Sequence, residues 1–203
     1  WYWAHPPIYM PENCNLEAVE AIRDSVSIPL VCAGRMDPFV SAEAIEEKKI
    51  DAVGFARPFL ADGAWVTKMK EGHFEEIRPC ICCHNGCFNM TRYKGSANDQ
   101  SLSDSLHMAR CAVNAETMQS NVHYIKKTEK PKTIAIIGGG IGGMETARVL
   151  ALRGHHPVIY EKEDHLGGVF NAASSASFKG KLRELLSWYE LQMKKAKVEV
   201  HLS

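Results

Sequence analysis

The residues best suited to carry out chemistry in this sequence are cysteines near its middle. Cys80, Cys83, Cys87 and Cys111 follow the spacing C-x2-C-x3-C with a distant fourth member. A short irregular loop can turn the first three sulfurs toward one centre, and the fourth can close the site. Four thiolates suit either tetrahedral zinc or a [4Fe-4S] cluster. The spacing leaves both open, although structural zinc sites more often pair two C-x2-C halves.

Two neighbours of these cysteines leave further alternatives open. Cys82 adjoins Cys83 and could be a ligand in a shifted register, but we interpret it as a small residue beside the site. His84 is interpreted as a polar neighbour and not as a ligand. Five of the seven cysteines crowd between positions 80 and 111, while Cys14 and Cys32 stand apart. This distribution favours metal or redox use over a disulfide framework.

A glycine-rich loop further along the chain predicts a dinucleotide site. Gly138, Gly140 and Gly143 fit G-x-G-x-x-G, with Gly142 inside the same loop. The first glycine permits a tight turn, the second lets the backbone approach a pyrophosphate, and the third packs helix on strand. Glu161 follows Gly140 by 21 residues and ends the next apolar run. A carboxylate there can accept hydrogen bonds from the adenosine ribose hydroxyls.

The elements that must position these residues begin with alternating helix and strand signals. We expect helices over residues 16–26, 42–49 and 60–71, with strands over 28–33 and 51–56. Ser41 is expected to cap the second of these helices. This αβαβα order with short connections is typical of a parallel α/β fold.

The alternation stops between residues 78 and 111 and resumes later. Residues 94–105 are expected to form a polar surface loop between the third and fourth cysteines, and residues 126–132 a charged linker. A second domain is expected to begin near Lys132. Its strands are predicted at 133–137, 157–160 and 198–202, and its helices at 141–152 and 179–195.

The bulk composition excludes several classes of function. Lys+Arg and Asp+Glu number 24 each among 203 residues, so the charge gives no reason to expect a nucleic acid or a membrane surface as partner. The apolar runs are too short to span a membrane and no signal segment opens the chain, which makes a cytoplasmic protein the default. Because the chain starts without methionine and stops just after an apolar strand-like run, we interpret it as an excerpt.

Taken together, these motifs resemble the old yellow enzyme-like flavoproteins that carry an added FAD domain. That family includes 2,4-dienoyl-CoA reductase, 2-enoate reductase and trimethylamine dehydrogenase. The resemblance is carried by VCAGRMDP at 31–38, VGFARPFLAD at 53–62, RPCICCHNGC at 78–87, CAVN at 111–114 and the glycine loop. Two departures stand out: Cys82 replaces the usual glycine, and the segment from Cys87 to Cys111 is longer than usual.

The resemblance implies an α/β protein in three parts. Residues 1–77 would be the C-terminal end of an FMN-binding TIM (β/α)8 barrel, 78–131 an iron–sulfur cluster segment, and 132–203 the truncated start of a Rossmann-like FAD-binding domain. It implies the FMN phosphate at Gly34, Arg35, Ala56 and Arg57, where the residues alone leave the arginines open between phosphate contacts and surface salt bridges. The four cysteines would hold a [4Fe-4S] cluster. Gly168 lies in a second glycine pair, which shifts the expected ligand of the glycine loop from NAD to FAD.

The implied function is an NADH:flavin oxidoreductase of an anaerobe that reduces an activated C=C bond of the enoate or enoyl-CoA type. Electrons would pass from NAD(P)H through FAD, the cluster and FMN to a small-molecule substrate. The alternatives are an amine dehydrogenase of the trimethylamine dehydrogenase type and a non-catalytic zinc-bearing binding module. The family's catalytic acid would precede Trp1, so no catalytic residue is assigned. Because two barrel strands alone would expose unpaired edges, we expect residues 1–203 by themselves to be inactive and insoluble or molten.

Overall fold

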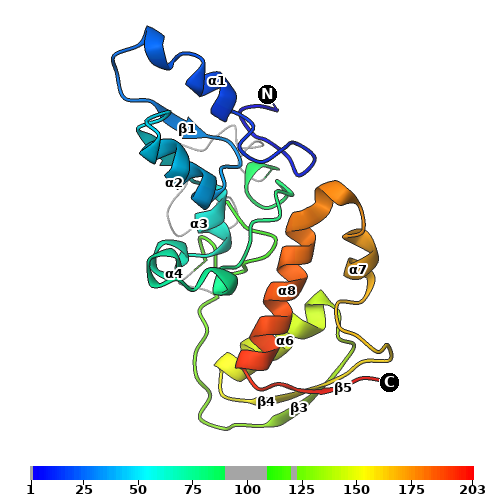
Figure 1. The fold of residues 1–203 in the computed structure, drawn as a ribbon. Helices are drawn as coiled ribbons and strands as arrows, with labels where there is room; N and C mark the ends of the chain where they lie inside the picture. Colours follow the sequence, from blue (N-terminus) through cyan, green and yellow to red (C-terminus); the bar gives the residue numbers. More distant parts are fainter. Residues whose placement is uncertain (1, 90–108, 120–122) are drawn as a thin grey trace.

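The structure, a computed structural model, describes residues 2–89, 109–119 and 123–203. It consists of an N-terminal α/β region, a segment that carries five of the cysteines, and a C-terminal α/β region (Figure 1). The surface loop predicted at 94–105 lies outside the described residues. Within the described ranges, no helix is long and apolar enough to cross a membrane.

The N-terminal region contains a parallel pair of strands, β1 (Val31–Ala33) and β2 (Ala52–Gly54). Its helices are α1 (Leu16–Glu20), η1 (Arg23–Ser25), α2 (Pro38–Glu46), α3 (Arg57–Ala61), α4 (Trp65–Glu71) and η2 (Phe74–Glu76). The predicted alternation of helices and parallel strands is confirmed. Both strands are shorter than predicted, and the first predicted helix ends at Glu20 and is followed by a short 3₁₀ turn.

Two details of the predicted helices are wrong. Asp37, not Ser41, caps α2: its carboxylate accepts hydrogen bonds from the N–H groups of Phe39 and Val40 at 2.9 and 3.0 Å. An Asp followed by Pro at the first helical position is a stronger start signal, so the helix begins earlier. The single helix predicted at 60–71 is divided into α3 and α4, because Asp62 has an extended backbone and its side chain accepts from the Ala64 N–H.

The C-terminal region agrees closely with the predicted elements. Its parallel sheet has the order β3-β4-β5. The elements are β3 (Thr133–Ile137), α6 (Ile141–Leu152), β4 (His156–Tyr160), α7 (Val169–Ala173), η5 (Ser177–Lys179), α8 (Gly180–Lys195) and β5 (Glu199–His201). Only α7 and η5 were not predicted, because both are too short to carry a clear helical period.

The main core lies where α6 and α8 pack on this sheet (Figure 1). Its eight buried members are Met144, Ala147, Ile159, Leu185, Leu186, Trp188, Tyr189 and Met193. Each large apolar side chain that is fully buried contributes roughly 1.5–3 kcal/mol. Ile81 and Val113 of the cysteine segment pack against the same core. The cysteine segment is therefore an extension of the C-terminal core and not an independent loop.

Candidate functional site

The four predicted ligand cysteines line one small cavity. Cys80 and Cys83 come from a stretch without regular secondary structure, Cys87 from the turn that follows, and Cys111 from the later part of the segment. No disulfide joins any of the seven cysteines. Chain positions separated by up to 31 residues thus converge on one space, as a shared cluster site requires.

A backbone contact at Gly86 joins the two halves of this cysteine cavity. The Arg110 N–H donates to the Gly86 carbonyl at 2.6 Å. A Cβ atom at position 86 would lie only 2.7 Å from the Arg110 carbonyl oxygen, so a larger residue would push the halves apart. Glycine at this position therefore brings Cys87 and Cys111 to the same cavity.

The sulfur of Cys111 lies in a buried environment with backbone donors. Burial raises the pKa of the Cys111 thiol, and hydrogen bonds from the N–H groups of Val113 and Asn114 act in the opposite direction. Cys83 and Cys87 are close enough to raise the same pKa through their charges. N–H donors aimed at sulfur are also a means by which proteins adjust the potential of iron–sulfur clusters.

The end of α3 anchors both sides of the cysteine cavity. The Leu60 carbonyl accepts hydrogen bonds from Asn114 Nδ2 at 3.1 Å and from Thr117 Oγ1 at 2.6 Å. Asp62 Oδ2 accepts from the Arg78 N–H at 2.9 Å and from Lys68 Nζ at 2.6 Å. The motifs VGFARPFLAD and CAVN are therefore in direct contact, although some fifty residues separate them.

Asp62 is a buried carboxylate that these donors keep ionised. Burial alone would raise its pKa, but hydrogen bonds from Lys68 and from the N–H groups of Arg78 and Ala64 hold the pKa below its usual value. Sequence analysis assigns Asp62 no role beyond its place in the motif VGFARPFLAD. Its importance depends on a tertiary contact with residue 78 that no local pattern reveals.

Cys82 faces a different space from its neighbours. It has a left-handed backbone (φ 52°), a conformation that favours glycine, and it is 8% exposed. Its side chain lines a second, larger cavity and not the cysteine cavity. A hydrogen bond with Cys80 lowers the pKa of Cys82 against the effect of burial, and the charges of Arg35, Arg57 and Lys181 lower it further.

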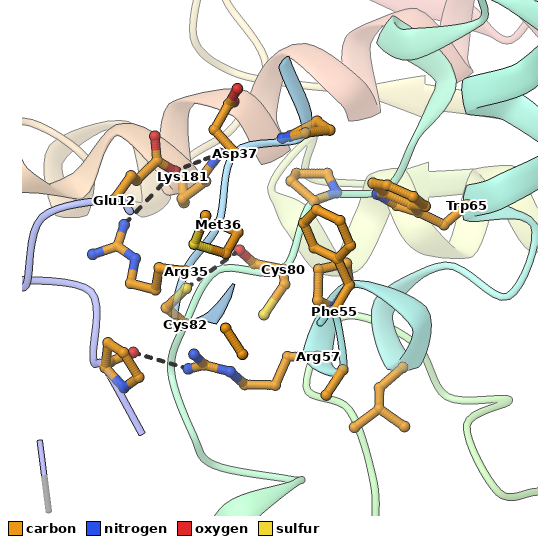
Figure 2. A pocket seen from close by; sticks show the side chains of 18 of the residues that line it. Glu12, Arg35, Met36, Asp37, Phe55, Arg57, Trp65, Cys80, Cys82 and Lys181 are labelled. Atoms are coloured by element: carbon orange, nitrogen blue, oxygen red, sulfur yellow. Dashed lines mark hydrogen bonds and ion pairs between the residues drawn. The ribbon is translucent and has the colours of Figure 1, made fainter. Parts of the chain in front are cut away.

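The larger cavity has a volume of about 660 Å³ and lies beyond the carboxyl ends of β1 and β2. Gly34, Arg35, Ala56 and Arg57 all line it, as Figure 2 shows for the two arginines. Gly34 and Arg35 have positive φ angles of 129° and 50°, so the turn after β1 is strained for an ordinary residue. The four residues predicted to bind a phosphate therefore do lie around one space.

The two arginines of this cavity are partly engaged in holding the N-terminal loop. Arg35 Nη1 donates to the carbonyls of Pro7 at 3.0 Å and Ile8 at 2.8 Å, and Arg57 Nη1 donates to Pro6 at 2.9 Å. The Arg35 side chain is 6% exposed, yet its Nε is a buried donor with no hydrogen-bond partner among the residues that the structure describes. An orphaned donor at this position fits an anionic oxygen in the cavity.

Two further contacts bring other parts of the chain to this cavity. Arg57 Nη1 contacts His84 Nε2, and burial, Arg57 and His5 lower the pKa of His84. Lys181 at the start of α8 enters the cavity from the C-terminal region and pairs with Glu12 at 2.9 Å (Figure 2). The sequence offered no signal for Lys181, because only tertiary packing carries α8 to the end of β1.

The glycine loop has the backbone geometry that its motif predicts. Gly138 has φ 103°, and a Cβ at Gly143 would lie 2.0 Å from the Gly138 carbonyl oxygen. A Cβ at Gly140 or at Gly142 would meet no atom within 4 Å. The first and third glycines therefore allow strand and helix to approach closely, whereas Gly140 and Gly142 border open space at the start of α6, where an anion is favoured.

A second glycine pair and Glu161 support this loop. Gly168 has φ 53°, and the adjacent Gly167 N–H donates to the Gly139 carbonyl at 2.9 Å. Glu161 Oε2 accepts from the Gly139 N–H at 2.6 Å, and this bond, followed by one from the Glu163 N–H, lowers the pKa of Glu161. Each carboxylate oxygen retains a further lone pair that a ribose hydroxyl could use.

A comparison with known proteins extends these observations. A family profile described as an NAD(P)-binding Rossmann-like domain matches residues 136–184. The cinnamate reductase of Clostridium sporogenes is 37% identical over 204 residues, which cover 100% of this chain and 29% of that protein. The NADH oxidase of Thermoanaerobacter brockii is 36% identical over 196 residues, covering 96% of this chain and 28% of that protein.

Solved structures also match this chain over nearly its whole length. A 2-naphthoyl-CoA reductase in complex with 2-naphthoyl-CoA matches with a TM-score of 0.82 and 26% identity, covering 97% of this chain and 28% of that one. Histamine dehydrogenase from Rhizobium sp. 4-9 matches with a TM-score of 0.81 and 25% identity, covering 98% of this chain and 28% of that one.

Along nearly its whole length the chain is thus similar to one part of reductases and dehydrogenases, in agreement with the resemblance to old yellow enzyme-like proteins found in the sequence. Its C-terminal region contains the match to the NAD(P)-binding Rossmann-like profile. The chain spans less than a third of the length of the curated relatives named above.

Proposed function

We propose that this chain is the cofactor-bridging part of an NAD(P)H-dependent flavin oxidoreductase that reduces an activated C=C bond in a small molecule. The observation that carries the proposal is the position of the cysteine cavity. It shares Arg57, Cys80, His84 and Cys87 with the larger cavity on one side. On the other side, Ile81 and Val113 pack on the core of the Rossmann-like region.

The proposed division follows these contacts: 1–77 is the end of an FMN-binding barrel, 78–131 the cluster segment, and 132–203 the start of an FAD-binding domain. The FMN phosphate would be held by Gly34, Arg35, Ala56 and Arg57, and the buried Nε of Arg35 supports that assignment. FAD would be held by Gly138, Gly140, Gly142, Gly143, Glu161 and Gly168. When bound, the flavins would supply hydride and single-electron chemistry, and a [4Fe-4S] cluster would carry single electrons between them.

The order of the cysteines along the chain favours a cluster over a single zinc ion. Cys80, Cys83 and Cys87 follow C-x2-C-x3-C, whereas structural zinc sites more often pair two C-x2-C halves. The four cysteines share one cavity, and the chain is similar along nearly its whole length to reductases. The zinc-bearing binding module is therefore the weaker interpretation.

The experiment is the anaerobic purification of the full-length enzyme, followed by cofactor analysis and reduction. We expect FMN, FAD and about four irons per chain, with NADH or NADPH bleaching the flavin absorbance and an enoate such as cinnamate restoring it. A protein that contains zinc and no iron would contradict the cluster. A protein with all three cofactors that NAD(P)H does not reduce would contradict the direction of electron flow.

A second candidate is an amine dehydrogenase, in which the substrate reduces FMN and electrons leave through the cluster. The similarity to histamine dehydrogenase along nearly the whole chain favours keeping it. Amines and NAD(P)H can be added separately to the oxidised enzyme. Bleaching of the flavin absorbance by an amine, with no bleaching by NAD(P)H, would support the amine dehydrogenase.

A further inference from the structure

Arg78 is a buried cation beside the cysteine cavity that the proposed function does not use. It lies two residues before Cys80, and its guanidinium carbon is 4.6 Å from the centroid of the Trp188 ring. Trp188 belongs to α8 in the main core, and its Nε1 donates to the Glu76 carbonyl at 2.9 Å. The arginine is thus fixed against the C-terminal region by a cation–π contact.

The Arg78 guanidinium also binds the segment that contains the fourth cysteine. Arg78 Nη1 donates to the Val113 carbonyl at 2.7 Å. That carbonyl and the Asn114 N–H are the two ends of one peptide group. The Asn114 N–H donates to the Cys111 carbonyl oxygen at 3.3 Å, so this peptide group contacts Cys111 directly. A cation on the carbonyl end of a peptide polarises it and makes its N–H a stronger donor.

We infer that Arg78 is a positioning residue of the cysteine cavity: fixed on Trp188, it binds the Val113 carbonyl and directs the Val113–Asn114 peptide toward Cys111. This inference rests on the proposed function, since the peptide matters when Cys111 is a cluster ligand. Its consequence is that Arg78 links the C-terminal core to the cluster and favours the reduced, more negative form of that cluster.

Arg148 provides a matched control on the same aromatic ring. Its guanidinium carbon lies 5.8 Å from the Trp188 centroid. Its Nε and Nη2 both donate to Glu145, one turn earlier in the same helix, at 2.8 Å each. Arg148 therefore stacks on Trp188 as Arg78 does, but its hydrogen bonds remain within α6.

The test compares Arg78→Gln, Arg78→Lys and Arg148→Gln in the full-length, anaerobically purified enzyme. Iron and acid-labile sulfide are counted first, and the midpoint potential of the cluster is then measured by a redox titration followed by electron paramagnetic resonance. We expect R78Q to lower the equilibrium constant for cluster reduction about tenfold, which is 59 mV for one electron. R78K should stay within threefold of the wild type, and R148Q should not differ from it.

The remaining outcomes either support the role of Arg78 or overturn it. Loss of iron in R78Q with retention in R78K and R148Q would support the role, because the cation would then be needed to hold the cavity together. Potentials that are equal in R78Q and wild type, or shifted equally in R148Q, would overturn the role of Arg78 while leaving the cluster in place. A wild-type enzyme without iron would overturn the proposed function and the role of Arg78 with it.

Discussion

The two α/β regions of this chain differ in the size of their buried apolar cores. The C-terminal region has eight buried core residues under a three-stranded sheet, whereas the N-terminal core has four, Cys32, Met36, Ala44 and Ile50, beside two strands. The cysteine segment packs its apolar side chains on the larger core and makes its polar contacts with α3 of the smaller region. The difference indicates that the C-terminal region provides stability, while the N-terminal contacts shape the cysteine cavity.

The largest effect is expected from the glycine loop of the C-terminal region. Gly143→Ala would place a Cβ 2.0 Å from the Gly138 carbonyl oxygen and should cost about 3 kcal/mol or more of unfolding free energy, because a backbone atom must move. Gly142→Ala is the control: it meets nothing within 4 Å and replaces a helical glycine, so it should gain up to about 1 kcal/mol. Chemical denaturation of the full-length protein measures both. Equal stabilities would contradict the close approach of strand and helix.

A smaller loss of stability, with a specific loss of iron, is expected at the junction of the cysteine cavity. Gly86→Ala would place a Cβ 2.7 Å from the Arg110 carbonyl oxygen and should cost about 1–3 kcal/mol while separating Cys87 from Cys111. At Gly63 the added Cβ meets nothing within 4 Å, so Gly63→Ala serves as control. Iron analysis and chemical denaturation of the two variants measure the loss of iron and the loss of stability. Full iron occupancy in G86A would argue that the two halves are not joined there.

Replacement of Asp62 tests the polar link between the regions. Asp62→Asn removes the negative charge that pairs with Lys68 and replaces one carboxylate oxygen, a hydrogen-bond acceptor, by an amide nitrogen. The substitution should lower the free energy of unfolding by about 1–3 kcal/mol near neutral pH. Because the pKa of Asp62 is lower in the folded protein than the ordinary value of about 3.9, its contribution is complete above about pH 4. The contribution disappears as the pH falls through the lowered pKa. The stability difference between wild type and D62N should therefore shrink in acid; a difference that is constant with pH would exclude the ionised carboxylate as its source.

The smallest effect concerns the cap of α2 in the N-terminal region. Asp37→Ala removes the acceptor for the N–H groups of Phe39 and Val40 and should cost about 1 kcal/mol. Ser41→Ala removes only a hydroxyl that donates to the Asp37 carbonyl within the helix, so its cost should be clearly smaller. Thermal unfolding of both variants compares them. The reverse order would restore Ser41 as the cap.

The sequence was most informative where the partners of a residue are local. In the C-terminal region, β3 and α6 begin and end where predicted, because an apolar run, a glycine turn and a regular helical period follow one another directly. The division of α3 from α4 was missed because it depends on the Asp62 side chain, which also binds the N–H of Arg78. The cysteine set was visible from its spacing, but Lys181 and the stacking of Arg78 on Trp188 were not, since residues far apart in sequence make those contacts.

The most direct test of the account is the iron and acid-labile sulfide content of Cys111→Ser and Cys82→Ser in the anaerobically purified full-length protein. Cys111 lines the cysteine cavity with the three other proposed ligands, whereas Cys82 faces the larger cavity. We predict about four irons per chain in the wild type and in C82S, and loss of most of the iron in C111S. Iron loss in C82S with retention in C111S would contradict the proposed ligand set.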